Sequence, residues 1–207
     1  MNILVYGDSM SWGIIPGSRN RQPRALRWPG IMQQRLGPEI SVIEECLNGR
    51  TTHFDDPNRP KRNGLEYIQM ILESHSPIDL IVVMLGINDF QDVIGANAIE
   101  SAAGYEKLIS RLQTLKPEPM KRPAQILAIV PPDIVEPLNT MADKFSGYTR
   151  GHGAEARYIN VLETLDVPYI RASEHITLSR FDGVHLDTPE HNLLGQEVAK
   201  RVTALMT

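Results

Sequence analysis

Short apolar runs recur along the chain, separated by longer stretches in which apolar residues follow a helical period. The runs are rich in β-branched residues, are bounded by glycine, proline or aspartate, and show no polar–apolar alternation. Near-continuous apolarity is typical of parallel strands that are covered on both faces. The runs predict five buried strands, at Ile3–Tyr6, Ile40–Ile43, Leu80–Leu85, Ile126–Val130 and Val167–Ile170.

Four other stretches place apolar residues three or four positions apart, which is the spacing of one helical face. They predict helices within residues 65–75, 102–115, 154–165 and 188–205. The last begins at Thr188-Pro189-Glu190, where proline suits the first helical turn. Strands alternating with helices indicate an open α/β sheet with helices on both faces, whose strand-end loops gather at one edge.

Composition narrows the class of protein. The 207 residues are 42% hydrophobic and 22% charged, and no repeat or boundary interrupts them, so we expect one globular domain over 1–207. A net charge of -4 argues against a nucleic-acid partner, and the single cysteine, Cys46, excludes an internal disulfide framework. No apolar run can span a bilayer and no signal peptide is recognisable, so we expect a cytoplasmic protein without membrane attachment.

Candidate chemistry follows the predicted strands. Polar residues and glycines stand together at Gly7-Asp8-Ser9, Asn48-Gly49-Arg50, Gly86-Ile87-Asn88-Asp89 and, before the last helix, Asp182-Gly183-Val184-His185. In a doubly wound sheet these segments converge at the carboxyl edge, where ligands bind.

The residue types in these segments suit nucleophilic catalysis. The hydroxyl of Ser9 needs a base, and imidazole titrates near neutral pH, so His185 is the natural partner. Asp182, three residues before His185 and separated from it by the flexible Gly183, can fold back to orient the ring. The set predicts a Ser9–His185–Asp182 triad that needs no metal and no cofactor.

A tetrahedral intermediate also needs hydrogen-bond donors for its oxyanion. The backbone N–H groups of Ser9 and Gly49 and the side-chain amide of Asn88 are the candidates. We expect Asp8 to be structural, hydrogen-bonding its own loop, and Asp89 to cap the segment that follows it.

Together the four segments resemble the blocks of the SGNH (GDSL) hydrolase family. The resemblance implies a Ser-His-Asp esterase on a three-layer, flavodoxin-like sandwich of about five parallel strands with helices on both faces. A narrower resemblance, to the arylesterase/acyltransferase branch, rests on Gly7-Asp8-Ser9-Met10-Ser11-Trp12-Gly13, Arg27-Trp28, Glu44-Glu45-Cys46-Leu47, Arg50-Thr51-Thr52, Asp55-Asp56-Pro57, Asn63-Gly64 and Met84-Leu85-Gly86.

That branch cleaves small aryl and alkyl esters, and some members pass the acyl group to alcohols or hydrogen peroxide. The resemblance therefore implies a small ester as substrate, and it favours Trp12 as a wall of the acyl pocket. Members are often oligomeric, which implies a homo-oligomer. The apolar residues of the long loop 131–146 are candidates for subunit contact: Ile134, Val135, Leu138, Met141 and Phe145.

Two other functions compete with this one. In a metal-dependent phosphoesterase, Asp8, Asp89, Asp182 and His185 would be ligands for Mg²⁺ or Mn²⁺, although no second acidic residue stands near Asp8. A non-catalytic nucleotide-binding module is disfavoured, because the first strand is not followed by a glycine-rich phosphate-binding motif. Among the remaining histidines, His152, His175 and His191 have no partner at ligand spacing and are expected to be solvated.

Overall fold

Five parallel strands form the central sheet of the computed structural model, which describes residues 1–206. They are β1 (Asn2–Gly7), β2 (Ser41–Cys46), β3 (Leu80–Met84), β4 (Gln125–Val130) and β5 (Tyr169–Arg171). Their spatial order is β2-β1-β3-β4-β5, which is the order of flavodoxin-like folds. The predicted fold class is confirmed.

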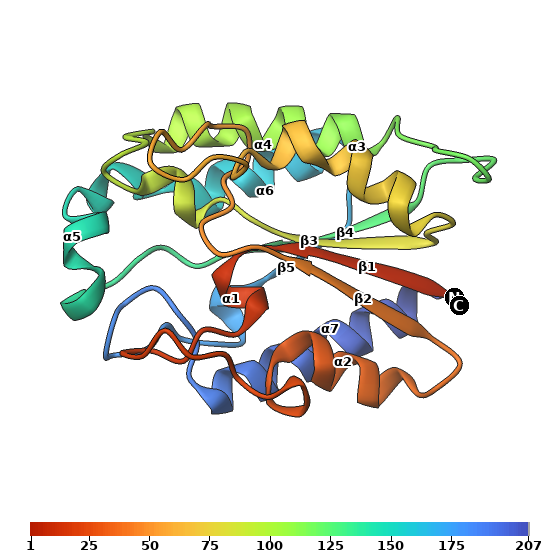
Figure 1. Cartoon of the computed structure of the whole chain (residues 1–207), viewed down its shortest axis with the longest axis horizontal. Helices are drawn as coiled ribbons and strands as arrows, with labels where there is room; N and C mark the ends of the chain where they lie inside the picture. The colour runs from red at the N-terminus through yellow and green to blue at the C-terminus, as the bar shows by residue number, and fades with distance from the viewer. Residues whose placement is uncertain (207) are drawn as a thin grey trace.

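Helices cover both faces of this sheet (Figure 1). The helices α2 (Trp28–Leu36) and α7 (Thr188–Met206) pack together on one face. On the other face lie α3 (Gly64–His75), α4 (Ala98–Leu112) and α6 (Ala154–Thr164). Short helical segments complete the chain: α1 (Ser9–Trp12), η1 (Arg24–Leu26), η2 (Ile87–Phe90), η3 (Asn139–Met141), α5 (Ala142–Phe145), η4 (Tyr148–Gly151) and η5 (Ala172–Glu174).

Two differences from the predicted elements have local causes. The fifth strand begins at Tyr169 rather than Val167, because the Val167 N–H still bonds the carbonyl of Leu162 at the end of α6. The helix α2 was not predicted. Its sequence, WPGIMQQRL, contains proline and glycine and carries only a short apolar face, but proline in the first turn is compatible with a helix.

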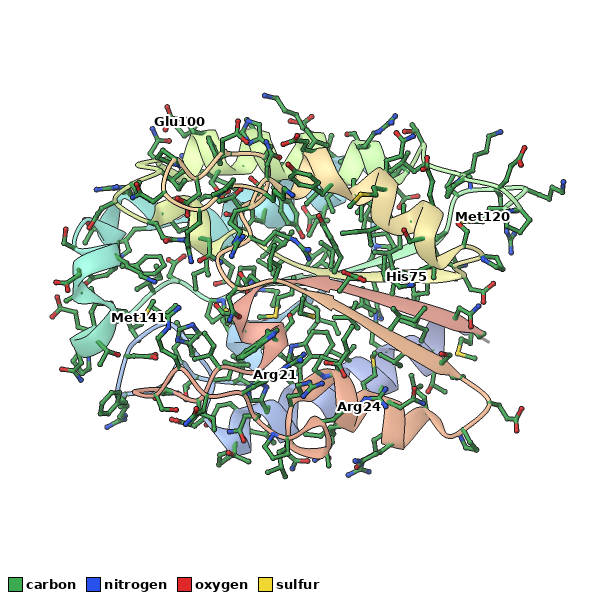
Figure 2. All side chains as sticks on the ribbon, viewed as in Figure 1. Arg21, Arg24, His75, Glu100, Met120 and Met141 are labelled. Carbon is green, nitrogen blue, oxygen red and sulfur yellow. The ribbon has the colours of Figure 1, made fainter. Side chains whose placement is uncertain are left out.

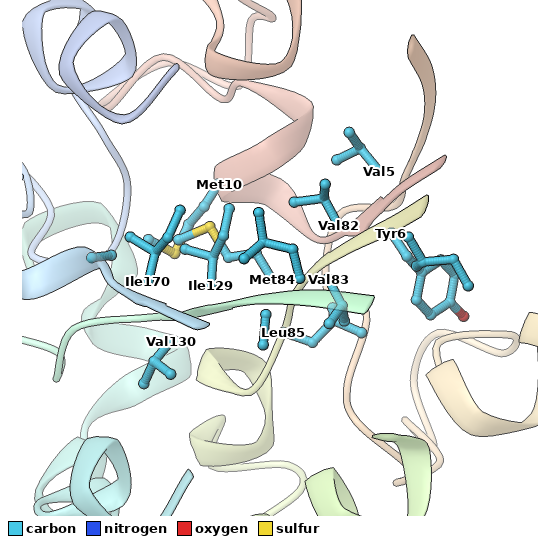
Figure 3. Close-up of a cluster of buried hydrophobic side chains, with 14 of the residues drawn as sticks. Val5, Tyr6, Met10, Val82, Val83, Met84, Leu85, Ile129, Val130 and Ile170 are labelled. Carbon is cyan, nitrogen blue, oxygen red and sulfur yellow. The ribbon is translucent and has the colours of Figure 1, made fainter. Parts of the chain in front are cut away.

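The core lies on both faces of the sheet. Every residue of β3 is buried, as are five of the six residues of β1. Figure 3 shows part of this core, in which side chains of β1, β3, β4 and β5 form one buried cluster with Met10 of α1. Burying each such side chain contributes about 1.5–3 kcal/mol, so α1, and the serine that opens it, is anchored to the sheet.

The loop 131–146 contributes to the same core. Ile134, Leu138 and Phe145 are buried within the chain itself, and Val135 is the exposed member of the proposed contact set. The three buried residues therefore offer no surface to a second subunit, and the homo-oligomer stays a prediction. Within residues 1–206, no helix combines the length and apolarity needed to cross a membrane.

Candidate active site

Ser9 is held where the first strand turns into a helix. The strand β1 ends at Gly7, and Asp8 caps α1 by accepting a hydrogen bond from the Met10 N–H at 2.9 Å. A side chain at position 7 would overlap Ser11, whose Cβ lies 2.6 Å from where a Cβ would stand. Glycine therefore allows the tight turn that places the Ser9 side chain at the carboxyl edge of the sheet.

A second turn brings His185 to this serine from the far end of the sequence. The Nε2 atom of His185 lies 3.0 Å from the Ser9 Oγ, and its Nδ1 atom lies 2.8 Å from the Asp182 Oδ2. The other carboxylate oxygen of Asp182 accepts the N–H groups of Val184 at 3.1 Å and His185 at 2.9 Å. The three side chains predicted to act together are thus joined by hydrogen bonds.

The electrostatics of Asp182 favour its charged form. Burial alone would raise the pKa of this carboxyl, but the hydrogen bonds and positive charge of His185 and the two backbone N–H groups outweigh it and lower the pKa below its ordinary value. The carboxylate therefore stays ionised at neutral pH, where it can hold a proton on the Nδ1 atom of His185 and stabilise an imidazolium.

Gly183 fixes the shape of this turn. Its φ of 66° lies in the left-handed region that favours glycine. A Cβ there would also collide with the carbonyl group of Val135, while the Val135 N–H donates to the Gly183 carbonyl at 3.1 Å. The turn that carries His185 is therefore locked against the loop 131–146.

Beside Ser9, the loop after β2 presents Gly49. Gly49 has φ 80°, and a Cβ at this position would lie 2.6 Å from the guanidinium carbon of Arg59. The buried Arg50 supports the turn from behind, because its guanidinium donates to the Gly7 carbonyl at 3.0 Å and stacks 4.1 Å from the Tyr6 ring centroid. The backbone of Gly49 consequently reaches the same cavity as Ser9.

Asn88 of η2, which follows β3, lines the same cavity as Ser9, and its amide group is hydrogen-bonded at both ends. Its Nδ2 atom donates to the Asp8 Oδ2 at 3.0 Å, and its Oδ1 atom accepts from the Gln91 Nε2 at 2.8 Å. Gln91 is held in turn by Arg59 at 3.0 Å, and Arg59 by Asp56 at 2.8 Å. The clamp fixes the amide orientation and uses one of its two N–H groups, which leaves the other for a ligand.

These groups line a cavity of about 240 Å³ at the carboxyl edge. The lining residues are Ser9, Ile14, Ile15, Gly17, Ser18, Arg19, Asn48, Gly49, Arg59, Asn88, Gln91, Thr140, Met141, Lys144, Phe145, Asp182 and His185. Ser9, Gly49, Asn88, Asp182 and His185 are brought together as the sequence predicted. Trp12 is not in this lining, because its ring lies beside the guanidinium of Arg21, 4.7 Å from the ring centroid.

The other two acidic residues in the predicted segments are structural. Asp8 bonds its own loop, as expected, and burial raises its pKa to about 6 against the opposing effects of its hydrogen bonds and of His185 and Arg50. The expectation that Asp89 caps the following segment is wrong. Its buried carboxylate accepts hydrogen bonds from Thr52, through both N–H and Oγ1, and from Ser101.

The carboxylates that would bind the metal in a phosphoesterase are instead hydrogen-bonded to other groups of the protein. Asp8 bonds Met10 and Asn88, whereas Asp182 bonds His185. In the described part of the chain, no three side chains of His, Cys, Asp or Glu converge as a metal site would require. The geometry offers this alternative no support.

The prediction that His191 is solvated is also wrong. It is fully buried on α7, where its Nδ1 atom accepts the Trp28 N–H at 3.3 Å. Burial lowers its pKa to about 4, aided by the positive charges of His185 and Arg27. The first residue of the unpredicted helix α2 is thus hydrogen-bonded to this histidine of α7. No local sequence signal revealed the contact.

A flavodoxin-like sheet with a serine–histidine–aspartate chain at its carboxyl edge defines a class of serine hydrolases. The sequence matches the family model described as GDSL-like lipase/acylhydrolase over residues 5–191. The chain therefore belongs to the GDSL/SGNH family of esterases and is a hydrolase of that family. A search of curated proteins finds no match to the sequence.

Solved structures of this kind align over nearly the whole chain. Est24, a carbohydrate acetylesterase from Sinorhizobium meliloti, is 32% identical with a TM-score of 0.93, and the alignment covers 99% of both chains. An aryl esterase from M. smegmatis is 30% identical with a TM-score of 0.92 over 99% of both chains. A putative arylesterase from Agrobacterium tumefaciens is 29% identical with a TM-score of 0.87 over 98% of both chains.

Proposed function

We propose that the protein hydrolyses small carboxylic esters through an acyl-enzyme formed on Ser9. The observation that carries this proposal is His185, which lies within hydrogen-bond reach of both the Ser9 hydroxyl and the Asp182 carboxylate. A base that is oriented by a third group and bonded to a nucleophile is the arrangement required for attack by a neutral hydroxyl.

In the first half of the reaction, the Ser9 Oγ attacks the ester carbonyl while the Nε2 atom of His185 takes the hydroxyl proton. Asp182 keeps the Nδ1 proton in place and stabilises the resulting imidazolium. The developing oxyanion accepts hydrogen bonds from the backbone N–H groups of Ser9 and Gly49 and from the free N–H of Asn88. The Ser9 N–H is available because the first residues of a helix have no intrahelical acceptor.

Collapse of the tetrahedral intermediate breaks the bond to the alcohol, which takes the proton from His185 and leaves. A water molecule then gives its proton to the same imidazole and attacks the acyl group. When the second tetrahedral intermediate collapses, the Ser9 Oγ takes this proton from His185 and the acid departs. Both half-reactions use the same side chains and the same backbone N–H donors.

The size of the cavity supports a small substrate. Its volume of about 240 Å³ lies below the roughly 300–1,000 Å³ of ordinary small-molecule sites. Related structures carry the names carbohydrate acetylesterase and aryl esterase. Esters with short acyl groups, acetyl esters above all, are therefore the proposed substrates.

The test replaces the nucleophile. We expect Ser9→Ala to lower kcat/KM for p-nitrophenyl acetate by at least about a thousandfold, because the acyl-enzyme cannot form. Ser74→Ala, which changes an exposed serine on α3, is the matched control and should keep full activity. An organophosphonate should add one phosphonyl group to Ser9, read by mass spectrometry. Retained turnover in the Ser9→Ala protein would refute the proposal.

The acyl-enzyme also defines how acyl transfer would be recognised. We extend the proposal to alcohols and hydrogen peroxide as acyl acceptors that replace water in the second half-reaction. A series of p-nitrophenyl esters of increasing acyl length, run with and without an added alcohol, separates the two outcomes by product analysis. Formation of the free acid alone at high alcohol concentration would limit the protein to hydrolysis.

A further inference from the structure

The charges that line the cavity differ in sign from the protein as a whole. The chain carries a net charge of -4. The cavity is nevertheless lined by three cationic side chains, Arg19, Arg59 and Lys144. Its one acidic lining residue is Asp182, whose carboxylate is bonded to His185.

Two of these cations have no acidic partner. Arg59 is paired with Asp56, N to O 2.8 Å, and donates to Gln91. Among residues 1–206, neither Arg19 nor Lys144 forms an ion pair. Elsewhere in the molecule arginines gather around carboxylates, as Arg21, Arg24 and Arg27 do around Glu44. Arg19 and Lys144 therefore bring charges to the cavity lining that no carboxylate of the described residues neutralises through an ion pair.

The three cations also act on one another. Lys144 is partly buried, and its pKa is lowered by that burial and by the positive charges of Arg59 and Arg19, against the weaker pull of Asp56. They come from three separate segments: the loop after α1, the loop after β2, and α5. Cations that repel each other around a cavity attract an anion, because the low-dielectric walls concentrate their field.

We propose that the natural ester carries a carboxylate, held at the cavity mouth by Arg19, Arg59 and Lys144 while its carbonyl lies against Ser9. The proposal rests on the esterase function proposed above and adds a charge to the substrate. A guanidinium pairs with a carboxylate through paired N–H donors, and an ammonium adds a compact point charge. A carboxylate is also small enough to share this cavity with a short acyl group.

The carboxylate belongs to either the alcohol or the acyl portion of the ester, so the experiment has two arms. In the first, 4-acetoxybenzoate is compared with methyl 4-acetoxybenzoate. In the second, 4-nitrophenyl hydrogen succinate is compared with its methyl ester. For each pair, the selectivity is the ratio of kcat/KM for the anionic ester to kcat/KM for its neutral partner.

The variants are Arg19→Gln, Lys144→Gln and the double substitution, each of which removes charge and keeps a polar side chain. We expect each single change to lower the selectivity about threefold to fivefold in one arm, and the double change to lower it at least about tenfold. The control is Lys121→Gln, an exposed lysine next to Met120. In Figure 2, Met120 beside this lysine and Met141 of the cavity lining lie at opposite ends of the molecule. The control therefore removes a positive charge far from the cavity.

A second measurement needs no variant. Raising the ionic strength from about 0.02 M to 0.5 M should lower kcat/KM for the anionic ester several-fold more than for its neutral partner, because salt screens the cavity charges. Selectivity that stays within twofold in the double variant and in salt, in both arms, would overturn the proposal while ester turnover continues. If none of the four esters is hydrolysed, the esterase function itself fails, and the proposal with it.

Discussion

The cavity has two regions that are held in opposite ways. Its floor is formed by Ser9, Asn88, Asp182 and His185, which are at most 5% exposed. Hydrogen bonds join Ser9, His185 and Asp182 to one another, and Asn88 to the buried Asp8. Its rim includes Arg19 and Lys144, which lie on long connections and form no ion pair within residues 1–206. The reacting groups thus lie on buried, hydrogen-bonded turns at the carboxyl edge of the sheet, whereas the segments that carry the rim cations can vary in sequence and so set selectivity.

The largest effect that separates floor from rim should come from Asp182→Asn. The amide still fits the turn but no longer stabilises an imidazolium or holds the Nδ1 proton, so we expect kcat to fall by about ten-thousand-fold. The measurement is steady-state hydrolysis of p-nitrophenyl acetate. Asp143→Asn, an exposed change on α5, is the control. A loss below tenfold for Asp182→Asn would mean that the floor does not work as a triad.

The next effect concerns the buried His191, which lies outside both regions of the cavity, and it appears in stability rather than in catalysis. The pKa of His191 is about 4 in the folded protein and about 6.5 when unfolded. Between these values the unfolded chain binds the proton and the folded protein does not. The contribution of His191 to the free energy of unfolding is therefore fully present above about pH 6.5. It is lost as pH falls towards 4, which lowers the free energy of unfolding by about 3 kcal/mol.

Urea unfolding of the protein and of His191→Gln, at pH 7 and at pH 4.5, isolates this contribution. The free energy of unfolding should fall more steeply with acid in the unsubstituted protein than in the variant. Removing a rim charge by Lys144→Gln should leave the pH dependence unchanged. Parallel curves for the protein and His191→Gln would show that the buried imidazole does not resist protonation.

The smallest effect tests how the floor is kept in place. Gln91→Leu removes the hydrogen bond to the Asn88 Oδ1 atom without touching the nucleophile. The amide then loses one of its two clamps, and we expect kcat to fall about tenfold with KM nearly unchanged, because oxyanion binding is a transition-state interaction. A fall in kcat/KM that comes wholly from KM would show that Gln91 contacts substrate instead.

A matched variant separates orientation from packing. Gln91→Glu keeps an acceptor for Arg59 but places a carboxylate oxygen against the Asn88 Oδ1 atom. If the hydrogen bond from Gln91 orients the Asn88 amide, the kcat of Gln91→Glu should be no higher than that of Gln91→Leu. Recovery of full activity in Gln91→Glu would assign Gln91 to packing.

The sequence predicted the floor far better than the rim, for a physical reason. Strand runs such as Leu80–Leu85 are local signals, and the doubly wound topology brings their ends to one edge, so Ser9, Asn88 and His185 could be placed together in advance. Trp12 was misplaced as a pocket wall, because side-chain direction within a short turn depends on contacts, here with Arg21, that no local pattern encodes.

The same reason explains what was missed. Lys144 lies more than eighty residues from Arg59 and more than a hundred from Arg19, yet all three line one cavity. The burial of His191 depends on α2, whose proline and glycine hid its helical character. Such long-range encounters are decided by tertiary packing, which single-sequence patterns do not carry.

The contact between Gly183 and Val135 bears on how such an enzyme can change over evolutionary time. The loop that shapes the cavity and the turn that carries His185 share a hydrogen bond and a close backbone contact. An insertion or deletion in residues 131–138 would therefore move the histidine along with the wall. New substrates are more accessible by exchanging rim side chains than by altering loop length, so this lineage should diversify by substitution while the length of this loop stays constant.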